Sequence, residues 1–233
     1  MGFYTGWWNI LNSGKEQSDY ISAFLSSTKE AVEPLINGAD EELEAAYNVL
    51  MQIPTQLFLD VLAQNKVYPK LTPADVPCFS DMKNGSSRLN ELLSFYPDGL
   101  SFSEIGYQLM NSETDAAQKK YGENQSKLAA IMSLVYLDNQ RPIKVHATAL
   151  GEYLTRYDYS EKKAALQKLV LRDPCVKHLL CKALNGPVRY ADVVSFLKDS
   201  TKRRRRTNVR FLVTFVLEGT DRELLLSNID WEL

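Results

Sequence analysis

Apolar residues recur at three- and four-residue spacing through the first eighty residues, which is the period of an amphipathic helix. The pattern predicts helices over residues 19–32 and 40–64, and the second begins with three acids at residues 40–42. Negative charge suits a helix N-terminus because it meets the positive end of the helix dipole. Pro54 lacks a backbone donor and is expected to end or kink the second helix. The apolar positions that we expect on one face are Leu43, Ala46, Tyr47, Leu50, Leu57 and Leu62.

Turn-forming residues then interrupt this periodic pattern. Three prolines fall within residues 68–77, and residues 83–87 read Lys-Asn-Gly-Ser-Ser. Because proline and glycine break regular structure, these two stretches form the best linker candidate in the chain. We therefore expect residues 1–80 to form a separate, acidic helical region.

A new order of elements follows the linker, and it is the order of a winged helix-turn-helix unit. We assign this unit to residues 86–158. Its long helix is expected to bury Leu128, Ile131, Met132 and Val135. The predicted elements are, in order, a helix (88–95), a turn (96–99), a helix capped by Ser101, the long helix (124–136), a strand or hairpin arm (141–145) and a helix (149–154).

The last third repeats this order, which predicts a second winged unit over residues 159–233. Pro174 is well placed at a first helical position. The fold class is therefore mostly α: a helical N-terminal region followed by two winged helix-turn-helix units with short β wings. The predicted elements are helices at 161–171 and 174–184, a turn at 185–187, a helix at 190–198, a basic helix at 201–217 and a wing strand at 222–226.

The basic helix has two opposite faces when residues 201–217 are placed at 3.6 residues per turn. One stripe is apolar and is expected to pack on the preceding helices: Val209, Leu212, Val213 and Val216. The other side carries Arg203, Arg204, Thr207, Arg210 and Thr214, with Phe211 on the exposed side. A recognition helix needs this design, with a rigid apolar back and N-terminal turns that meet DNA. The exposed Phe211 also points to a neighbouring domain or subunit.

The candidate DNA contacts are amides, hydroxyls and cations suited to phosphates and base edges. In the second winged unit they are Lys202, Arg203, Arg204, Arg206, Thr207 and Arg210. In the first they surround the expected start of the long helix, with two more on the wing: Lys119, Lys120, Asn124, Gln125, Ser126 and Lys127, then Arg141 and Lys144.

Other interpretations of the basic run stay open. A Lys-Arg-Arg-Arg-Arg sequence also occurs in nuclear import signals and in solvated charged faces. It can equally bind RNA, an acidic protein or an anionic membrane surface. The first winged unit is only mildly basic and is an architectural candidate as well.

The composition is ordinary for a globular protein, and the uneven charge marks either a polyanion-binding part or an effect of solubility alone. The 233 residues are 45% hydrophobic and 24% charged, with a formal net charge of −2. Residues 1–80 carry 4 basic and 10 acidic side chains, whereas residues 160–233 carry 15 and 9. A basic C-terminal third attracts polyanions. No apolar run reaches membrane-spanning length, the N-terminus does not read as a secretory signal, and three cysteines suit a reducing compartment, so we expect a cytoplasmic protein without membrane contact.

Catalytic motifs are not found in the sequence. Cys175, His178 and Cys181 fall on one helix at three-residue steps, but a fourth metal ligand is missing, and buried thiols are the expected state. The phosphate-binding, nucleophile-elbow and zinc-protease motifs do not occur. We therefore expect a non-enzymatic protein without metal or cofactor.

Two phrases resemble prokaryotic tandem winged-helix DNA-binding proteins, in particular the targeting region of restriction-related proteins. One is Asn-Gln-Ser-Lys-Leu-Ala-Ala-Ile-Met-Ser-Leu-Val-Tyr-Leu at residues 124–137, followed by T-x-x-G-x-x-L at residues 148–154. The other is the S/T-x-x-R-R-R-x-T phrase at residues 200–207. The resemblance covers less than half of the chain. Because the chain lacks the nuclease core of restriction proteins, the resemblance implies a stand-alone binder or a targeting subunit.

The expected function is therefore binding of double-stranded DNA, as a regulator or targeting subunit of a DNA-processing or defence system. One alternative is a protein-interaction or scaffold subunit whose winged helices do not touch DNA. Another is a restriction-type nuclease with an unrecognised active site. The N-terminal aromatics are expected to make homodimer or partner contacts: Phe3, Tyr4, Trp7 and Trp8.

Overall fold

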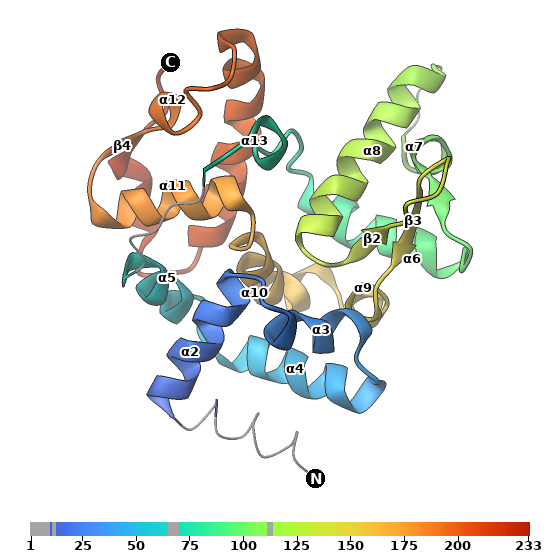
Figure 1. Cartoon of the computed structure of the whole chain (residues 1–233), viewed down its shortest axis with the longest axis horizontal. Coiled ribbons are helices and arrows are strands. Elements are labelled where there is room, and N and C mark those ends of the chain that lie inside the picture. Colours follow the sequence, from blue (N-terminus) through green and yellow to red (C-terminus); the bar gives the residue numbers. More distant parts are fainter. Residues whose placement is uncertain (1–9, 11–12, 65–69, 111–113) are drawn as a thin grey trace. The chain divides into compact units, whose positions relative to one another are not determined.

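The computed structural model describes residue 10 and residues 13–64, 70–110 and 114–233 (Figure 1). Helices dominate and the strands are short, so the prediction of a mostly α protein is confirmed. Backbone contacts divide the chain into two units. The first unit holds the described residues of Met1–Val32, Ala45–Cys78 and Ala164–Leu233, and the second those of Glu33–Glu44 and Phe79–Lys163. Among the described residues, none of the helices is long and apolar enough to cross a membrane.

The first unit is built from helices of both ends of the chain. Helices α3 (Lys29–Asn37), α4 (Asp40–Gln52) and α10 (Tyr159–Val170) each pass from one unit into the other. Its further elements are α2 (Gly14–Leu25), α5 (Thr55–Gln64), η1 (Pro73–Asp75), α11 (Pro174–Asn185), β4 (Val188–Arg189), α12 (Tyr190–Val193), α13 (Asp199–Leu217), η4 (Glu223–Asn228) and β5 (Ile229–Asp230).

Lysines of the C-terminal third cap helices of the N-terminal region. The buried Lys168 ammonium donates to the Leu50 carbonyl of α4 at 2.5 Å, and burial lowers the pKa of Lys168 to about 8. Lys177 donates to the Leu25 carbonyl at the end of α2, at 2.6 Å. Both bonds satisfy carbonyls that a helix C-terminus leaves without partners. Residues of the N-terminal region therefore pack with the C-terminal third, and most of the regions 1–80 and 159–233 belongs to one unit.

The predicted linker is folded rather than extended. Residues 83–87 continue as helix through η2 (Asn84–Arg88) into α6 (Leu89–Ser94), so this part of the linker prediction is wrong. The proline-rich stretch is held by Leu71 and Val76, which are buried. From residue 70 on, this stretch keeps an irregular backbone apart from η1, and the burial of these two side chains packs it into the first unit. Pro54, by contrast, separates α4 from α5 as predicted.

The second unit contains a three-stranded antiparallel sheet with strand order β1-β3-β2. The register pairs Leu100 with Val145 and Val135 with Ala147, which turns the apolar side chains Leu100, Val135 and Val145 into the core. Figure 1 shows α8 and the β2 and β3 hairpin of this unit. Its elements after α6 are β1 (Leu100–Ser101), α7 (Phe102–Leu109), α8 (Asp115–Ile131), β2 (Val135–Leu137), β3 (Lys144–Ala147), α9 (Ala149–Tyr153) and η3 (Leu154–Arg156).

Local signals set the beginnings of two of these helices. Gly99 has a φ of +70° in the turn before β1, and Ser101 caps α7 by accepting from the backbone N–H of Glu104. The Glu104 carboxylate accepts from the Ser101 N–H in return, at 2.7 Å, which completes a capping box. Thr148 caps α9 by accepting from the Gly151 N–H at 3.0 Å. The predicted turn and the predicted Ser101 cap are confirmed.

The predicted long helix begins and ends earlier in the chain than we expected. We expected it over residues 124–136, but α8 ends at Ile131 and Val135 lies in β2. Ser133 has a φ of 56°, which stops the helix, and the β-branched Val135 then pairs with β3. The sequence pattern is ambiguous here because a short apolar run fits either a helix or a strand.

Helices α7 and α8 cross at two glycines. A Cβ on Gly106 would lie 1.8 Å from the carbonyl oxygen of Gln118, and one on Gly122 would lie 2.0 Å from that of Phe102. The two backbones therefore touch where only glycine fits. This crossing fixes α8 against α7 and the core below them.

The end of the chain differs from the second winged unit that we predicted. Helix α12 ends at Val193 rather than at residue 198, and residues 223–226 of the predicted wing strand lie in η4. The strand that does form, β5, pairs in parallel with β4 and matches Val188 with Ile229. A parallel pair needs a long connection, and α12, α13 and η4 supply it here.

Candidate nucleic-acid interface

Helix α13 is amphipathic, and its apolar side is packed in the core of the first unit. It begins at Asp199, two residues before the expected start at residue 201, and its apolar stripe is buried as predicted. Gln167 of α10 holds the other end, because its side-chain amide donates to the carbonyls of Phe215 and Glu218, both at 2.8 Å. The basic run therefore belongs to a fixed helix. The stripe residues with no exposed surface are Val209, Leu212, Val213 and Val216.

The predicted outer face of α13 is exposed. Arg203, Arg204, Thr207 and Arg210 all face outward, and we call these four residues the arginine face. Within the described residues, Arg203 and Arg204 make no ion pair. Phe211 beside them is 47% exposed, as the helical wheel predicts. The arginine face thus displays three cations on about two helical turns.

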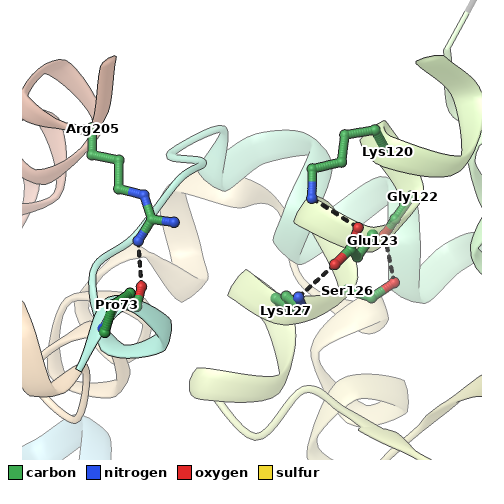
Figure 2. A network of polar contacts seen from close by, with 7 residues as sticks. All are labelled: Pro73, Lys120, Gly122, Glu123, Ser126, Lys127 and Arg205. Carbon is green, nitrogen blue, oxygen red and sulfur yellow. Dashed lines mark hydrogen bonds and ion pairs between the residues drawn. The ribbon is translucent and has the colours of Figure 1, made fainter. Parts of the chain in front are cut away.

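Two other arginines of the run point inward. Arg205 donates through Nη1 to the Pro73 carbonyl (Figure 2). The same nitrogen donates to the Val76 carbonyl at 2.9 Å. Arg206, a predicted DNA contact, is half-buried and donates to the Trp231 carbonyl at 3.1 Å. These guanidinium groups fix the helix to neighbouring backbone, so the prediction of Arg206 as a surface contact needs this correction.

Lys202 is also engaged within the protein. Its ammonium lies 3.2 Å from the Asp199 carboxylate, and its side chain is mostly buried. The backbone carbonyl of Lys202 faces the hydroxyl of Tyr190 at 3.5 Å. Lys202 therefore contributes less exposed charge than its place in the sequence indicates.

Trp231 is a residue that sequence reasoning missed. The Arg210 guanidinium lies 6.0 Å from the centroid of the Trp231 ring. The Tyr190 and Trp231 rings contact each other in a tilted arrangement, with 5.6 Å between their centroids. The β4–β5 pairing brings Trp231 to this place, together with the Arg189–Asp230 ion pair at 3.1 Å. A single aromatic near the end of the sequence carries no periodic signal that would have revealed this role.

The predicted contacts on α8 lie in the middle of the helix, because α8 begins at Asp115. Gln125 is fully buried and donates to the Tyr121 hydroxyl at 3.0 Å, so it cannot reach DNA. Ser126 is also buried and donates to the Gly122 carbonyl at 2.7 Å (Figure 2). Asn124 is half-buried, and Lys119 remains exposed. The prediction that these side chains surround a helix N-terminus is wrong.

Two lysines of α8 neutralise one carboxylate. Lys120 and Lys127 lie 2.8 Å and 2.5 Å from the Glu123 carboxylate (Figure 2). The hydrogen bonds from both lysines hold the pKa of Glu123 below its ordinary value. The spacing of three and four residues places these groups on one face of α8. This face is therefore much less positive than the two lysines alone would make it.

The predicted wing residues lie on the β2–β3 hairpin. Arg141 is exposed in the connection between the strands. Lys144 is half-buried and its ammonium donates to the Asp98 carbonyl at 3.1 Å. Asp138 accepts from the Lys144 backbone N–H at 2.8 Å, which orders the hairpin. Of the two wing cations, Arg141 alone projects freely.

The cysteines of α11 are buried thiols, as expected. Cys175 and Cys181 are both buried, and the Cys181 thiol donates to the Leu62 carbonyl at 3.3 Å. His178 is half-buried between them. Over the described residues, no group of histidine, cysteine and acidic side chains is arranged to hold a metal ion. The predicted N-terminal aromatic contacts, Phe3, Tyr4, Trp7 and Trp8, lie outside the described residues.

Charge is divided between the two units. The sequence of the first unit holds 17 basic and 13 acidic side chains, and that of the second holds 10 and 16. The arginine face thus belongs to a unit with formal charge +4, whereas α8 belongs to one with charge −6.

Comparisons of the chain with protein-family models, curated proteins and solved structures give no match.

Proposed function

We propose that this chain is a non-catalytic DNA-binding protein whose arginine face contacts double-stranded DNA. The observation that carries the proposal is the display of Arg203, Arg204 and Arg210 on a helix whose back is fully buried. An α-helix fits the major groove, and arginine pairs bidentately with guanine edges and with phosphates. Thr207 lies among the arginines and offers a hydroxyl to a phosphate.

The rigidity of α13 favours DNA over a flexible basic tail. Gln167 fixes its C-terminal end, and Arg205 and Arg206 fix its first turns to backbone carbonyls. The arginine face therefore needs little ordering when it binds, which lowers the entropic cost of association. A nuclear import signal, by contrast, is recognised in an extended segment, and the run is helical here.

We place α13 as the recognition helix of a helix-turn-helix formed with α12. In the second unit, the order α6-β1-α7-α8-β2-β3 with sheet order β1-β3-β2 supports a winged helix. In that unit the lysines of α8 are paired with Glu123, and the unit is acidic. We therefore assign the DNA contact to the first unit and an architectural or protein-binding role to the second, as part of a regulator or a targeting subunit.

A salt titration tests this function. Binding of a random-sequence duplex should weaken steeply with salt, since each phosphate contact contributes about 0.9 to the slope of log K against log salt. Arg203→Ala/Arg204→Ala should reduce that slope by about 1.8. The control Lys15→Ala/Lys29→Ala removes two exposed cations of α2 and α3 and should leave the slope unchanged. Equal slopes for the arginine variant and the wild type would refute the proposal.

A further inference from the structure

The second unit exposes several aromatic side chains on α7, in the turn before β1 and on β2. Tyr107 is 69% exposed and Tyr96 is 40% exposed. Both line a hollow of about 440 Å³ together with Leu100, Glu104 and Gln118. Exposed aromatic rings around a hollow are typical of surfaces that bind partners.

Two further rings, on β2 and β3, lie next to the turn that follows Tyr96. The Gly99 N–H donates to the Tyr96 carbonyl at 2.9 Å and closes the turn. Gly99 lies against the His146 ring, since a Cβ there would fall 2.6 Å from Cε1 of the imidazole. His146 in turn stacks on Tyr136, with 4.9 Å between the ring centroids and 9° between the planes. We define the aromatic band as Tyr107, Tyr96, His146 and Tyr136.

The fold holds these rings outward. The close crossing of α7 and α8 buries Ile105 and Gly106 and leaves Tyr107 on the opposite face of α7. Tyr136 and His146 are directly paired across β2 and β3, so the sheet pleat points both away from the core residue Val145. The stacked pair Tyr136 and His146 is therefore preorganised, and Tyr107 is exposed on the outer face of α7.

Carboxylates accompany the rings. Glu104 lines the hollow, and the hydrogen bonds from Ser101 keep the pKa of its carboxyl below the ordinary value. Asp138 lies 3.7 Å from His146, and Asp98 is exposed in the turn beside Gly99. Among the described residues of this hairpin there are two cations: the Lys144 ammonium is directed to the Asp98 backbone, and Arg141 is exposed in the connection between β2 and β3. The band thus combines π faces with an excess of negative charge, in a unit of formal charge −6.

Aromatic faces beside carboxylates match guanidinium and ammonium groups, which stack on rings and pair with acids. We propose that the aromatic band binds an arginine- or lysine-rich peptide segment of a partner protein. A nucleic acid is repelled by the same carboxylates. This surface is separate in sequence and charge from the arginine face, so the inference does not rest on DNA binding.

Fluorescence anisotropy with a labelled hexa-arginine peptide and the full chain tests the inference. The wild type should bind the peptide, and Tyr96→Ala/Tyr107→Ala should bind about tenfold more weakly. Tyr107→Phe keeps the ring and should bind as the wild type does. Phe196→Ala removes a 42% exposed ring of the first unit and should also have no effect. Far-UV circular dichroism of each variant establishes that the fold is retained.

Three outcomes would overturn the inference. In the first, Tyr96→Ala/Tyr107→Ala binds the peptide as tightly as the wild type does. In the second, this double variant loses affinity for duplex DNA and keeps its affinity for the peptide. In the third, the double variant changes self-association in sedimentation and keeps its affinity for the peptide, which would make a second copy the occupant. Arg203→Ala/Arg204→Ala separates the two proposals. This variant should keep its peptide affinity whether or not the chain binds DNA.

Discussion

The guanidinium of Arg210 lies 6.0 Å from the centroid of the Trp231 ring, which connects the arginine face to the last strand of the protein. The same tryptophan accepts a hydrogen bond from Arg206 through its backbone carbonyl, at 3.1 Å. Two arginines of α13 are thus oriented by one residue that is distant in sequence. Trp231 is a positioning residue for the DNA contact that we propose.

Replacement of Trp231 should weaken DNA binding without removing any positive charge. A cation–π contact at an exposed site contributes about 0.5–1 kcal/mol, so Trp231→Ala should bind a duplex about threefold more weakly. Trp231→Phe retains a ring and should lose less. The measurement is duplex affinity at fixed salt. A DNA affinity of Trp231→Ala equal to that of the wild type would show that Arg210 needs no such support.

Arg205 should matter for stability rather than for DNA. Its replacement by methionine leaves the carbonyls of Pro73 and Val76 without their donor, which should cost about 1–3 kcal/mol of unfolding free energy. The neighbouring exposed Arg204→Met should change stability by less than about 0.5 kcal/mol. Urea unfolding of both variants measures the difference. Salt slopes should show the reverse ranking, and equal stability losses would contradict this assignment.

Asp173 should make the protein less stable as pH rises from about 4 to 7. Burial raises the pKa of this carboxyl to about 7 in the folded state, helped by the nearby Asp75 and opposed by its hydrogen bond from the Val176 N–H. Between the ordinary pKa and the raised one, the folded protein holds a proton that the unfolded chain has released. Stability is therefore present at low pH and is lost as pH rises through 7, by up to about 4 kcal/mol.

Asp173→Asn tests that pH dependence. The amide oxygen still caps α11 by accepting from the Val176 N–H, but it does not titrate. The variant should show a flatter profile of unfolding free energy between pH 4 and 7 than the wild type. Parallel profiles would show that the buried carboxyl is not the source.

Gly122 should tolerate no side chain. Gly122→Ala places a methyl group 2.0 Å from the Phe102 carbonyl and should destabilise the second unit by at least about 2 kcal/mol. Gly14→Ala is the control, because a Cβ at Gly14 meets nothing within 4 Å. Thermal unfolding of both variants should separate them by several degrees. Similar midpoints would mean that α7 and α8 do not cross as closely as described.

Periodic and capped segments were predictable from the sequence. The apolar stripe of α13, the Ser101 cap and the break at Pro54 all depend on neighbouring residues, and the structure has each of them. The extent of α8 was not predictable, since the pairing of Val135 with β3 decides it. Such pairing depends on residues far away in the chain, which outweigh local propensity.

The candidate site was predictable only in part for the same reason. The helical wheel of α13 places Arg203 and Arg210 outside, but it does not indicate that Arg206 is tied to Trp231. The pairing of Glu123 with two lysines of α8 was missed, although their spacing of three and four residues is visible in the sequence. The packing of both ends of the chain in one unit was also not predictable, because lysines such as Lys168 cap helices that are distant in sequence.

Site-specific photocrosslinking tests the central claim most directly. A benzoylphenylalanine placed at position 207, within the arginine face, should crosslink to a random-sequence duplex on irradiation. The same group at position 119 on α8, or at the exposed position 29 as a control, should not. Crosslinks from 119 with none from 207 would contradict the assignment of the DNA contact to α13.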